Sequence, residues 1–134
     1  SNTLMDTVSE QNMFSVESVR KEYDLEERTF IFAKNIRCFI KKVKQTISNI
    51  EDIKQLIRSS GSIGANYIEA NDSLGKKDFL MHVRISKKEA KESRYWLRLL
   101  DIENNSSLQN ERNDLVNEAT ELMNIMGAII IKFK

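Results

Sequence analysis

The sequence contains no proline, only four glycines and a single cysteine among its 134 residues. Small β-domains and loop-rich binding modules depend on proline and glycine turns, so this scarcity favours helices. One cysteine excludes an intramolecular disulfide and any zinc site built from several cysteines. Basic and acidic residues nearly balance, at 21 against 20. The overall charge therefore indicates neither a nucleic-acid partner nor an acidic one.

Long apolar runs are also missing. No stretch reaches the roughly 18 apolar residues that cross a bilayer, and the first residues lack the basic-then-apolar pattern of a signal peptide. We therefore expect a cytoplasmic protein without a membrane partner. The length fits one domain with one core. Cys38 stands in an apolar helical run, which predicts a buried core thiol.

Helical periodicity dominates what is present. Residues 1–22 show no clean period and are expected to form an N-terminal tail, with a short helix at most, whereas 23–134 are expected to form the folded unit. The first helix is predicted from about Asp24. Its seam follows a heptad spacing at Leu25, Thr29, Phe32, Ile36, Phe39 and Val43. A second apolar face adds Phe30, Ile31, Ala33 and Ile40.

Three more helices are predicted. The second starts at a cap on Ser48 or Asn49 and stops at 73–75, where Gly75 is a natural terminator. The third spans about 77–104, with a seam at Phe79, Val83, Ser86, Ala90, Ser93, Leu97 and Leu100. The fourth starts near Leu108, with a seam at Leu108, Leu115, Ala119, Leu122, Met126, Ile129 and Phe133. Its last turns are apolar nearly all round, which predicts burial on more than one side.

Four long helices with short connections predict an all-α, antiparallel up-down-up-down four-helix bundle. The apolar surplus of the first and fourth helices predicts a homo-oligomer that buries it. The stretch "RSSGSIGANYIEAN" at 58–71 is rich in small residues, and glycine alone costs a helix about 1 kcal/mol. We expect it to pack closely on the equally small centre of the third helix.

Catalytic signals are few. His82, the only histidine, stands one helical turn from Asp78 and from Ser86, so a general base is one interpretation and an exposed or interfacial histidine the other. The pairs Glu89/Glu92 and Glu118/Glu121 lack the histidines of a bundle metal site and indicate solvated faces or salt bridges. No glycine-rich phosphate loop is present. We predict no enzyme, no metal and no cofactor.

Local charge is more informative. The third helix carries eight basic and three acidic residues, and the start of the fourth is acidic. The basic surface is the candidate nucleic-acid-binding site. Its residues are Lys76, Lys77, Arg84, Lys87, Lys88, Lys91, Arg94 and Arg98. Alternatively, these charges pair the third and fourth helices with each other or between subunits. Tyr95 and Trp96 are candidates for base stacking, or else fill a core edge or an interface.

A motif lies across the second and third helices. Ser62 and Ile63 are followed by Asn66 and Glu69, and after a short turn come Asp78, Phe79 and the segment "KEAKESRYWLRLL", which contains Glu92. In order and spacing these residues resemble the signature of the bacterial four-helix-bundle family named for proteins encoded in intervening sequences of 23S ribosomal RNA genes.

This resemblance implies a bundle assembled as a closed ring, typically a pentamer, with no known catalytic activity. A related branch serves as the accessory protein of diversity-generating retroelements and works with a reverse transcriptase and nucleic acid. We expect Asn66 and Glu69 to cap or bond the turn between the second and third helices and the neighbouring basic residues of the third. We expect Asp78 to cap the third helix or to compensate its dipole.

The sequence thus predicts a non-enzymatic oligomeric scaffold. Its partners would be further copies of itself and RNA, DNA, a nucleic-acid enzyme or another ribonucleoprotein component, bound through the third helix. The alternative is a protein-protein adaptor that binds no nucleic acid.

Overall fold

The computed structural model describes residues 13–134, with side chains described from residue 25 onward. Residues 1–12 of the predicted tail lie outside this range. Four helices account for most of the described chain: α2 (Met13–Ile40), α3 (Ile47–Asn71), α4 (Lys76–Leu99) and α5 (Ser106–Phe133). The first of them begins at Met13, well before the predicted start at Asp24.

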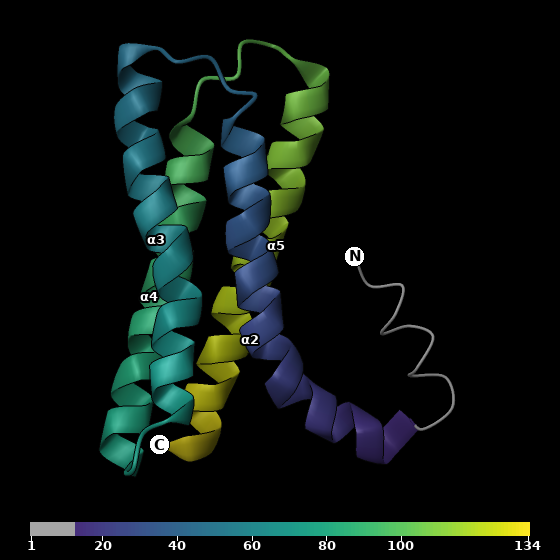
Figure 1. Ribbon diagram of the computed structural model, residues 1–134, viewed down its shortest axis with the longest axis vertical. Coiled ribbons are helices and arrows are strands. Elements are labelled where there is room, and N and C mark those ends of the chain that lie inside the picture. The colour runs from purple at the N-terminus through teal and green to yellow at the C-terminus, as the bar shows by residue number, and fades with distance from the viewer. Residues whose placement is uncertain (1–12) are drawn as a thin grey trace.

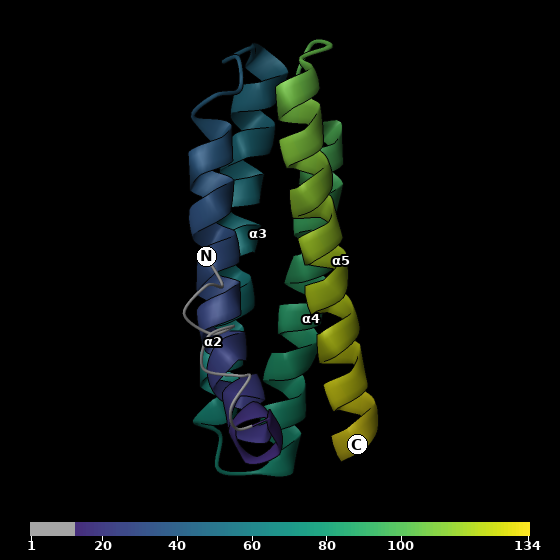
Figure 2. The ribbon, with the colours of Figure 1, turned by 90° about the vertical axis from the view of Figure 1, so that its right-hand side faces the viewer.

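α3, α4, α5 and the later part of α2 run along a common long axis, whereas the first turns of α2 lead away from the bundle (Figures 1 and 2). The α2–α3 and α4–α5 connections lie at one end of the bundle, and the α3–α4 turn lies at the other (Figure 1). In the described part of the chain, α2 and α4 each pack on α3 and on α5 but not on each other. The two therefore occupy diagonal corners of the bundle. No described helix is long and apolar enough to span a membrane.

The predicted seams form the core. All six seam residues of the first predicted helix are buried, including Val43 just beyond the end of α2. In the third, every seam residue from Val83 to Leu100 is buried, while Phe79 is half-buried. Each fully buried large apolar side chain contributes about 1.5–3 kcal/mol. The largest of them are Phe32, Phe39, Ile36, Leu56, Ile63, Leu97, Leu122 and Met126. The heptad interpretation of the sequence is confirmed for these residues.

The C-terminal end of α5 departs from the prediction. Ile131 is 73% exposed and Phe133 is 46% exposed, so a single chain does not bury this end on several sides. Phe133 packs edge-on against Phe79 at the start of α4, with 5.5 Å between ring centroids. A helix at one corner of a four-helix bundle buries one stripe, and the remaining apolar side chains stay in solvent.

Small residues bring α3 and α4 together, as predicted. Ser93 donates a hydrogen bond to Ser59 at 2.9 Å, and the Ser86 hydroxyl donates to the carbonyl of Ile63 at 2.9 Å. All three serines are fully buried. Because a hydroxyl reaches a neighbouring backbone only at short range, these bonds require the close approach that small side chains permit.

Helix boundaries differ from the prediction in several places. Thr46, not Ser48 or Asn49, caps α3, with its hydroxyl accepting from the backbone N–H of Asn49. Gly75 does not terminate α3, which ends at Asn71; it is the N-cap of α4. The third predicted helix ends at Leu99, short of Asn104, because the chain turns into a connection. Glu103 and Asn104 there have φ of 55° and 50°, left-handed values that asparagine tolerates better than most residues.

Cys38 is exposed, so the predicted buried thiol is wrong. The residue lies two positions after Ile36, about 200° further round the helix. An apolar stretch of sequence therefore places Cys38 on the outer side of α2, opposite the seam that enters the core.

Candidate nucleic-acid interface

The basic residues of α4 lie on its solvent-facing sides. Four of them recur every seventh residue, at Lys77, Arg84, Lys91 and Arg98, and all four are exposed. Seven residues make nearly two turns and advance about 10.5 Å, so these side chains follow one line along the helix. We call this line the basic strip. Lys76, Lys87 and Lys88 are exposed beside it, and Arg94 is half-buried.

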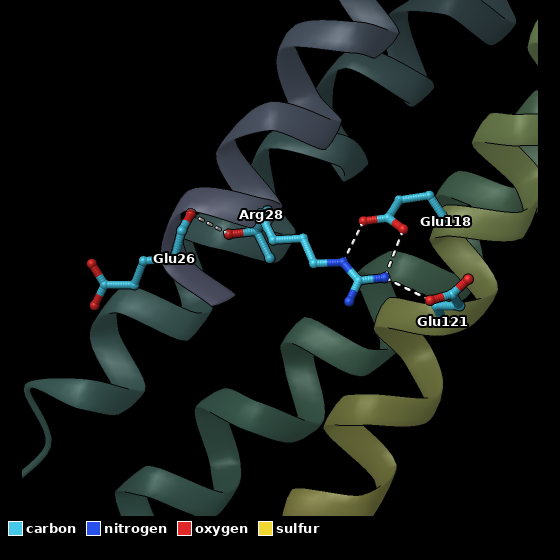
Figure 3. A network of polar contacts seen from close by, with 5 residues as sticks. Glu26, Arg28, Glu118 and Glu121 are labelled. Carbon is cyan, nitrogen blue, oxygen red and sulfur yellow. Dashed lines mark hydrogen bonds and ion pairs between the residues drawn. The ribbon is translucent and has the colours of Figure 1, made fainter. Parts of the chain in front are cut away.

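Three acidic residues of α5 have partners on α2 or on the connection that follows it. The Arg28 guanidinium donates to both carboxylate oxygens of Glu118, at 2.6 and 2.8 Å, and to Glu121 at 2.7 Å (Figure 3). The hydrogen bond to Glu118 is the main cause that raises the pKa of Arg28 above its ordinary value, and the bond to Glu121 adds to it. The guanidinium therefore stays charged at every ordinary pH. Lys42 reaches Glu111 at 2.8 Å.

The α4 cations make few contacts of this kind. Within the described residues, Lys88 alone of the eight forms an ion pair, at 3.9 Å to Glu89. Arg94 donates to the hydroxyl of Thr120 at 3.1 Å. The predicted alternative, in which the third and fourth helices pair through their charges within one chain, is therefore wrong. Arg28 and Lys42 occupy three carboxylates of α5, and the basic strip has no carboxylate partner in the described chain.

The motif residues lie mainly where α3 meets α4. Ile63 is buried in the core, and the Asn66 side-chain amide donates to the carbonyl of Ser62 at 2.9 Å. The Asn66 amide oxygen lies 3.3 Å from Nδ1 of His82 on α4. Asn66 thus joins the two helices through a histidine rather than through a basic side chain.

The other motif residues lie near the surface. The Glu69 side chain is exposed, and its backbone carbonyl accepts a hydrogen bond from Ser73 in the turn. Asp78 is exposed in the first turn of α4, where a carboxylate complements the helix dipole. Glu92 lies 3.8 Å from Arg58 on α3. Because Gly75 is the N-cap of α4 and no described side chain caps it, the predicted capping role of Asp78 is wrong. The dipole role of Asp78 and the roles of Glu69 and Glu92 stay predictions.

No arrangement typical of catalysis occurs in the described residues. His82 has Asn66 as its hydrogen-bond partner, and no bond to Asp78 or Ser86 is formed within this part of the chain. No cluster of three or more metal-binding side chains is found in residues whose side chains the structure describes.

The sequence prediction missed a second basic surface. Lys34, Arg37 and Lys41 line a groove on α2, together with Cys38, Ile40, Gln45 and Ile53. Spacings of three and four place the three cations on one helical face, a signal that was available in the sequence. It was overlooked because the same helix also carries the apolar seam.

The described chain is thus an all-α protein of four packed helices, with a small-residue contact between α3 and α4. The family model described as 23S rRNA-intervening sequence protein matches residues 21–128, and the chain belongs to this family. The resemblance noted from the sequence is thereby confirmed.

Comparison with a solved crystal structure supports the same family assignment. It is that of a protein with unknown function from the S23 ribosomal protein family of Bacteroides thetaiotaomicron VPI-5482. The two sequences are 31% identical, the match covers 79% of this chain and 97% of the other, and the TM-score is 0.68. No curated protein matches the chain.

Proposed function

We propose that this protein is a non-enzymatic scaffold that binds nucleic acid, or a ribonucleoprotein partner, through the basic strip of α4. The observation that carries the proposal is the division of charge. Three carboxylates of α5 pair with Arg28 and Lys42, and the strip has no carboxylate partner among the described residues. Unpaired cations in a line can each neutralise one phosphate and release its counterion, which makes binding favourable at low salt.

We further propose that an antiparallel up-down-up-down bundle of residues 23–134 is the folded unit and that it assembles into a homo-oligomer, with a pentameric ring as the first arrangement to test. Exposed Met81, Tyr95 and Leu99 on α4 support assembly. So do Oε1 of Glu89 and Nε1 of Trp96, buried atoms without a hydrogen-bond partner within the described chain. Such atoms cost free energy unless another molecule supplies the bond.

The test is binding to a structured ribosomal RNA fragment across a salt series. In the double variant Arg84→Gln/Lys91→Gln, two phosphate contacts are lost. The slope of log K against log salt should then become shallower by about 1 to 2, with weaker binding at low salt. The matched control is Lys54→Gln/Lys132→Gln, which removes the same charge elsewhere and should retain most of the affinity.

Two outcomes contradict the proposal. Equal losses in the two double variants would mean that only net charge matters. Absence of RNA binding at low salt would favour the protein-protein adaptor, and the basic strip would then contact acidic surfaces of a protein.

A further inference from the structure

The groove on α2 has a composition unlike the rest of that helix. It encloses about 560 Å³ and is lined by Lys34, Arg37, Cys38, Ile40, Lys41, Gln45 and Ile53. Three of these seven residues are cationic and none is acidic. A second hollow, of about 200 Å³ at the loop end of the bundle, has Asp101 and Glu103 beside Lys42 and Lys44, so its charges are mixed.

The groove cations are unpaired, whereas other cations of α2 and the following connection are not. Arg28 and Lys42 are held by carboxylates of α5, and Lys44 lies 3.5 Å from Glu103. On the groove side, Arg37 donates only to the carbonyls of Ala33 and Ile57. Lys34 and Lys41 form no ion pair in the described part of the chain.

The groove therefore has an excess of positive charge. Its nearness to the C-terminal end of α2 works against an anion, but the helix dipole there amounts to about −0.5 charge against three full positive charges. The side chains of Lys34 and Lys41 start from positions about 10.5 Å apart along the helix. An elongated ligand with several negative groups matches this arrangement better than a single small anion.

Beside these cations the groove has an apolar part. Ile40 and Ile53 are nearly buried and line it together with the Cys38 side chain. In a duplex the base faces are stacked and unavailable, while a single strand exposes them for contact with apolar surface. The combination of cations and apolar floor thus fits a single-stranded segment better than a duplex.

We propose that the α2 groove is a second nucleic-acid-binding surface and that it takes a single-stranded segment, such as a loop or an unpaired end. Lys34, Arg37 and Lys41 contact its phosphates, and Ile40 and Ile53 contact a base or sugar. The proposal rests on the proposed function, but it concerns a separate site, because α2 and α4 occupy diagonal corners of the bundle. One protein then holds an unpaired segment on one side and a structured element on the other.

The exposed thiol of Cys38 reports on occupancy of this groove. The chain has one cysteine, so modification by N-ethylmaleimide, an uncharged reagent, measures a single site. A single-stranded 12-nucleotide RNA at ten times its Kd should slow the reaction about tenfold. A duplex of the same length and concentration should slow it much less.

Variants separate the two sites. Lys34→Gln/Lys41→Gln should lose the protection, whereas Arg84→Gln/Lys91→Gln on α4 should retain it at the same fractional occupancy. Each variant is compared with itself in the presence and absence of RNA, so a change in intrinsic thiol reactivity cancels. Circular dichroism on each variant checks that the bundle is intact.

The outcomes are distinguishable. RNA binding that leaves Cys38 fully reactive overturns the groove proposal and leaves the α4 proposal standing. Protection that survives in Lys34→Gln/Lys41→Gln also overturns it, since the thiol would then be shielded by something other than a strand held by these cations. Failure to bind any RNA overturns both.

Discussion

Asn49 is a buried polar residue with all of its hydrogen bonds satisfied. Its amide nitrogen donates to the carbonyls of Lys44 and Asp101, both at 2.9 Å, and its amide oxygen accepts from the backbone N–H of Asp101 at 3.0 Å. The side chain thereby ties the α2–α3 connection to the start of the α4–α5 connection. Asn49 itself is fully buried, so its amide group depends on these protein partners because water does not reach it.

Replacing Asn49 by alanine should therefore destabilise the fold strongly. The change removes three hydrogen bonds, each worth about 0.5–1.5 kcal/mol, and leaves a cavity in place of a fully buried side chain. We expect a loss of about 3 kcal/mol in the free energy of unfolding, measured by urea denaturation. Ser48→Ala, at the exposed neighbouring position, should change stability by less than about 0.5 kcal/mol. A small effect at Asn49 would mean that the two connections hold their shape without it.

The sequence was least informative about the positions and partners of single residues. Serine and asparagine are common N-caps, so Ser48 or Asn49 was predicted to be one, yet Thr46 caps α3. The real partner of Asn49, Asp101, is 52 residues away in the sequence, and no local pattern connects the two. Cys38 was misplaced for a related reason, because apolar composition does not give the orientation of one side chain.

At the level of elements, α3 contains two glycines, Gly61 and Gly64, that lower its helix propensity. The packing of α3 requires only one of them. A Cβ added at Gly64 would lie 2.8 Å from Oγ1 of Thr29, a buried side chain that also bonds the carbonyl of Glu26. A Cβ added at Gly61 would lie 3.6 Å from the Arg37 guanidinium, which is an ordinary contact. Gly64 is thus needed for the approach of α2, and Gly61 is not.

The two alanine variants should therefore shift stability in opposite directions. Gly61→Ala should raise the melting temperature, since alanine is favoured over glycine in a helix by up to about 1 kcal/mol. Gly64→Ala should lower it, because overpacking a core costs about 1–3 kcal/mol. Differential scanning calorimetry measures both. A gain in stability for Gly64→Ala would show that Thr29 moves aside easily.

The four helices could be predicted from the sequence, but the residues at which they begin and end were less predictable. The seams of the first, third and fourth predicted helices were visible because heptad spacing fixes which residues face the core, as the burial of Phe32, Ile36 and Phe39 shows. The ends depend on the turns. Leu100 leaves the helical conformation, although nothing in the residues from 100 to 104 forbids a helix. The α5 carboxylates pair with Arg28 and Lys42 instead of with α4. This choice of partner depends on the tertiary arrangement of the helices, which cannot be deduced from the charge composition.

At the level of the whole molecule, apolar surface remains after the bundle is complete. Met81 and Leu99 stand at 45% and 48% exposure on α4, and Tyr95 at 54%. These side chains are large and occur on a single helix. Large apolar side chains that stay exposed on one helix are the candidates for a contact with another molecule.

The variant Met81→Glu/Leu99→Glu should dissociate the assembly. Introducing two carboxylates into an apolar contact leaves charges unpaired on association. We expect a mass near the 15.6 kDa of one chain by light scattering, with unchanged helix content. Leu74→Glu, on an exposed leucine in the α3–α4 turn, is the control and should keep the wild-type mass. A wild-type protein that is already monomeric would contradict the expectation.

The hydrogen bonds of Asn49 link the α2–α3 and α4–α5 connections, and this link limits where residues can be inserted into the chain. Surface connections usually accept inserted residues at little cost in stability. Here the two connections at one end share hydrogen bonds, so lengthening either would disturb the geometry of both. Among residues whose side chains are described, the turn at 72–75 carries no such link, and Leu74 is fully exposed there. A reporter peptide or a purification tag is therefore best grafted into that turn, at the opposite pole from the linked connections.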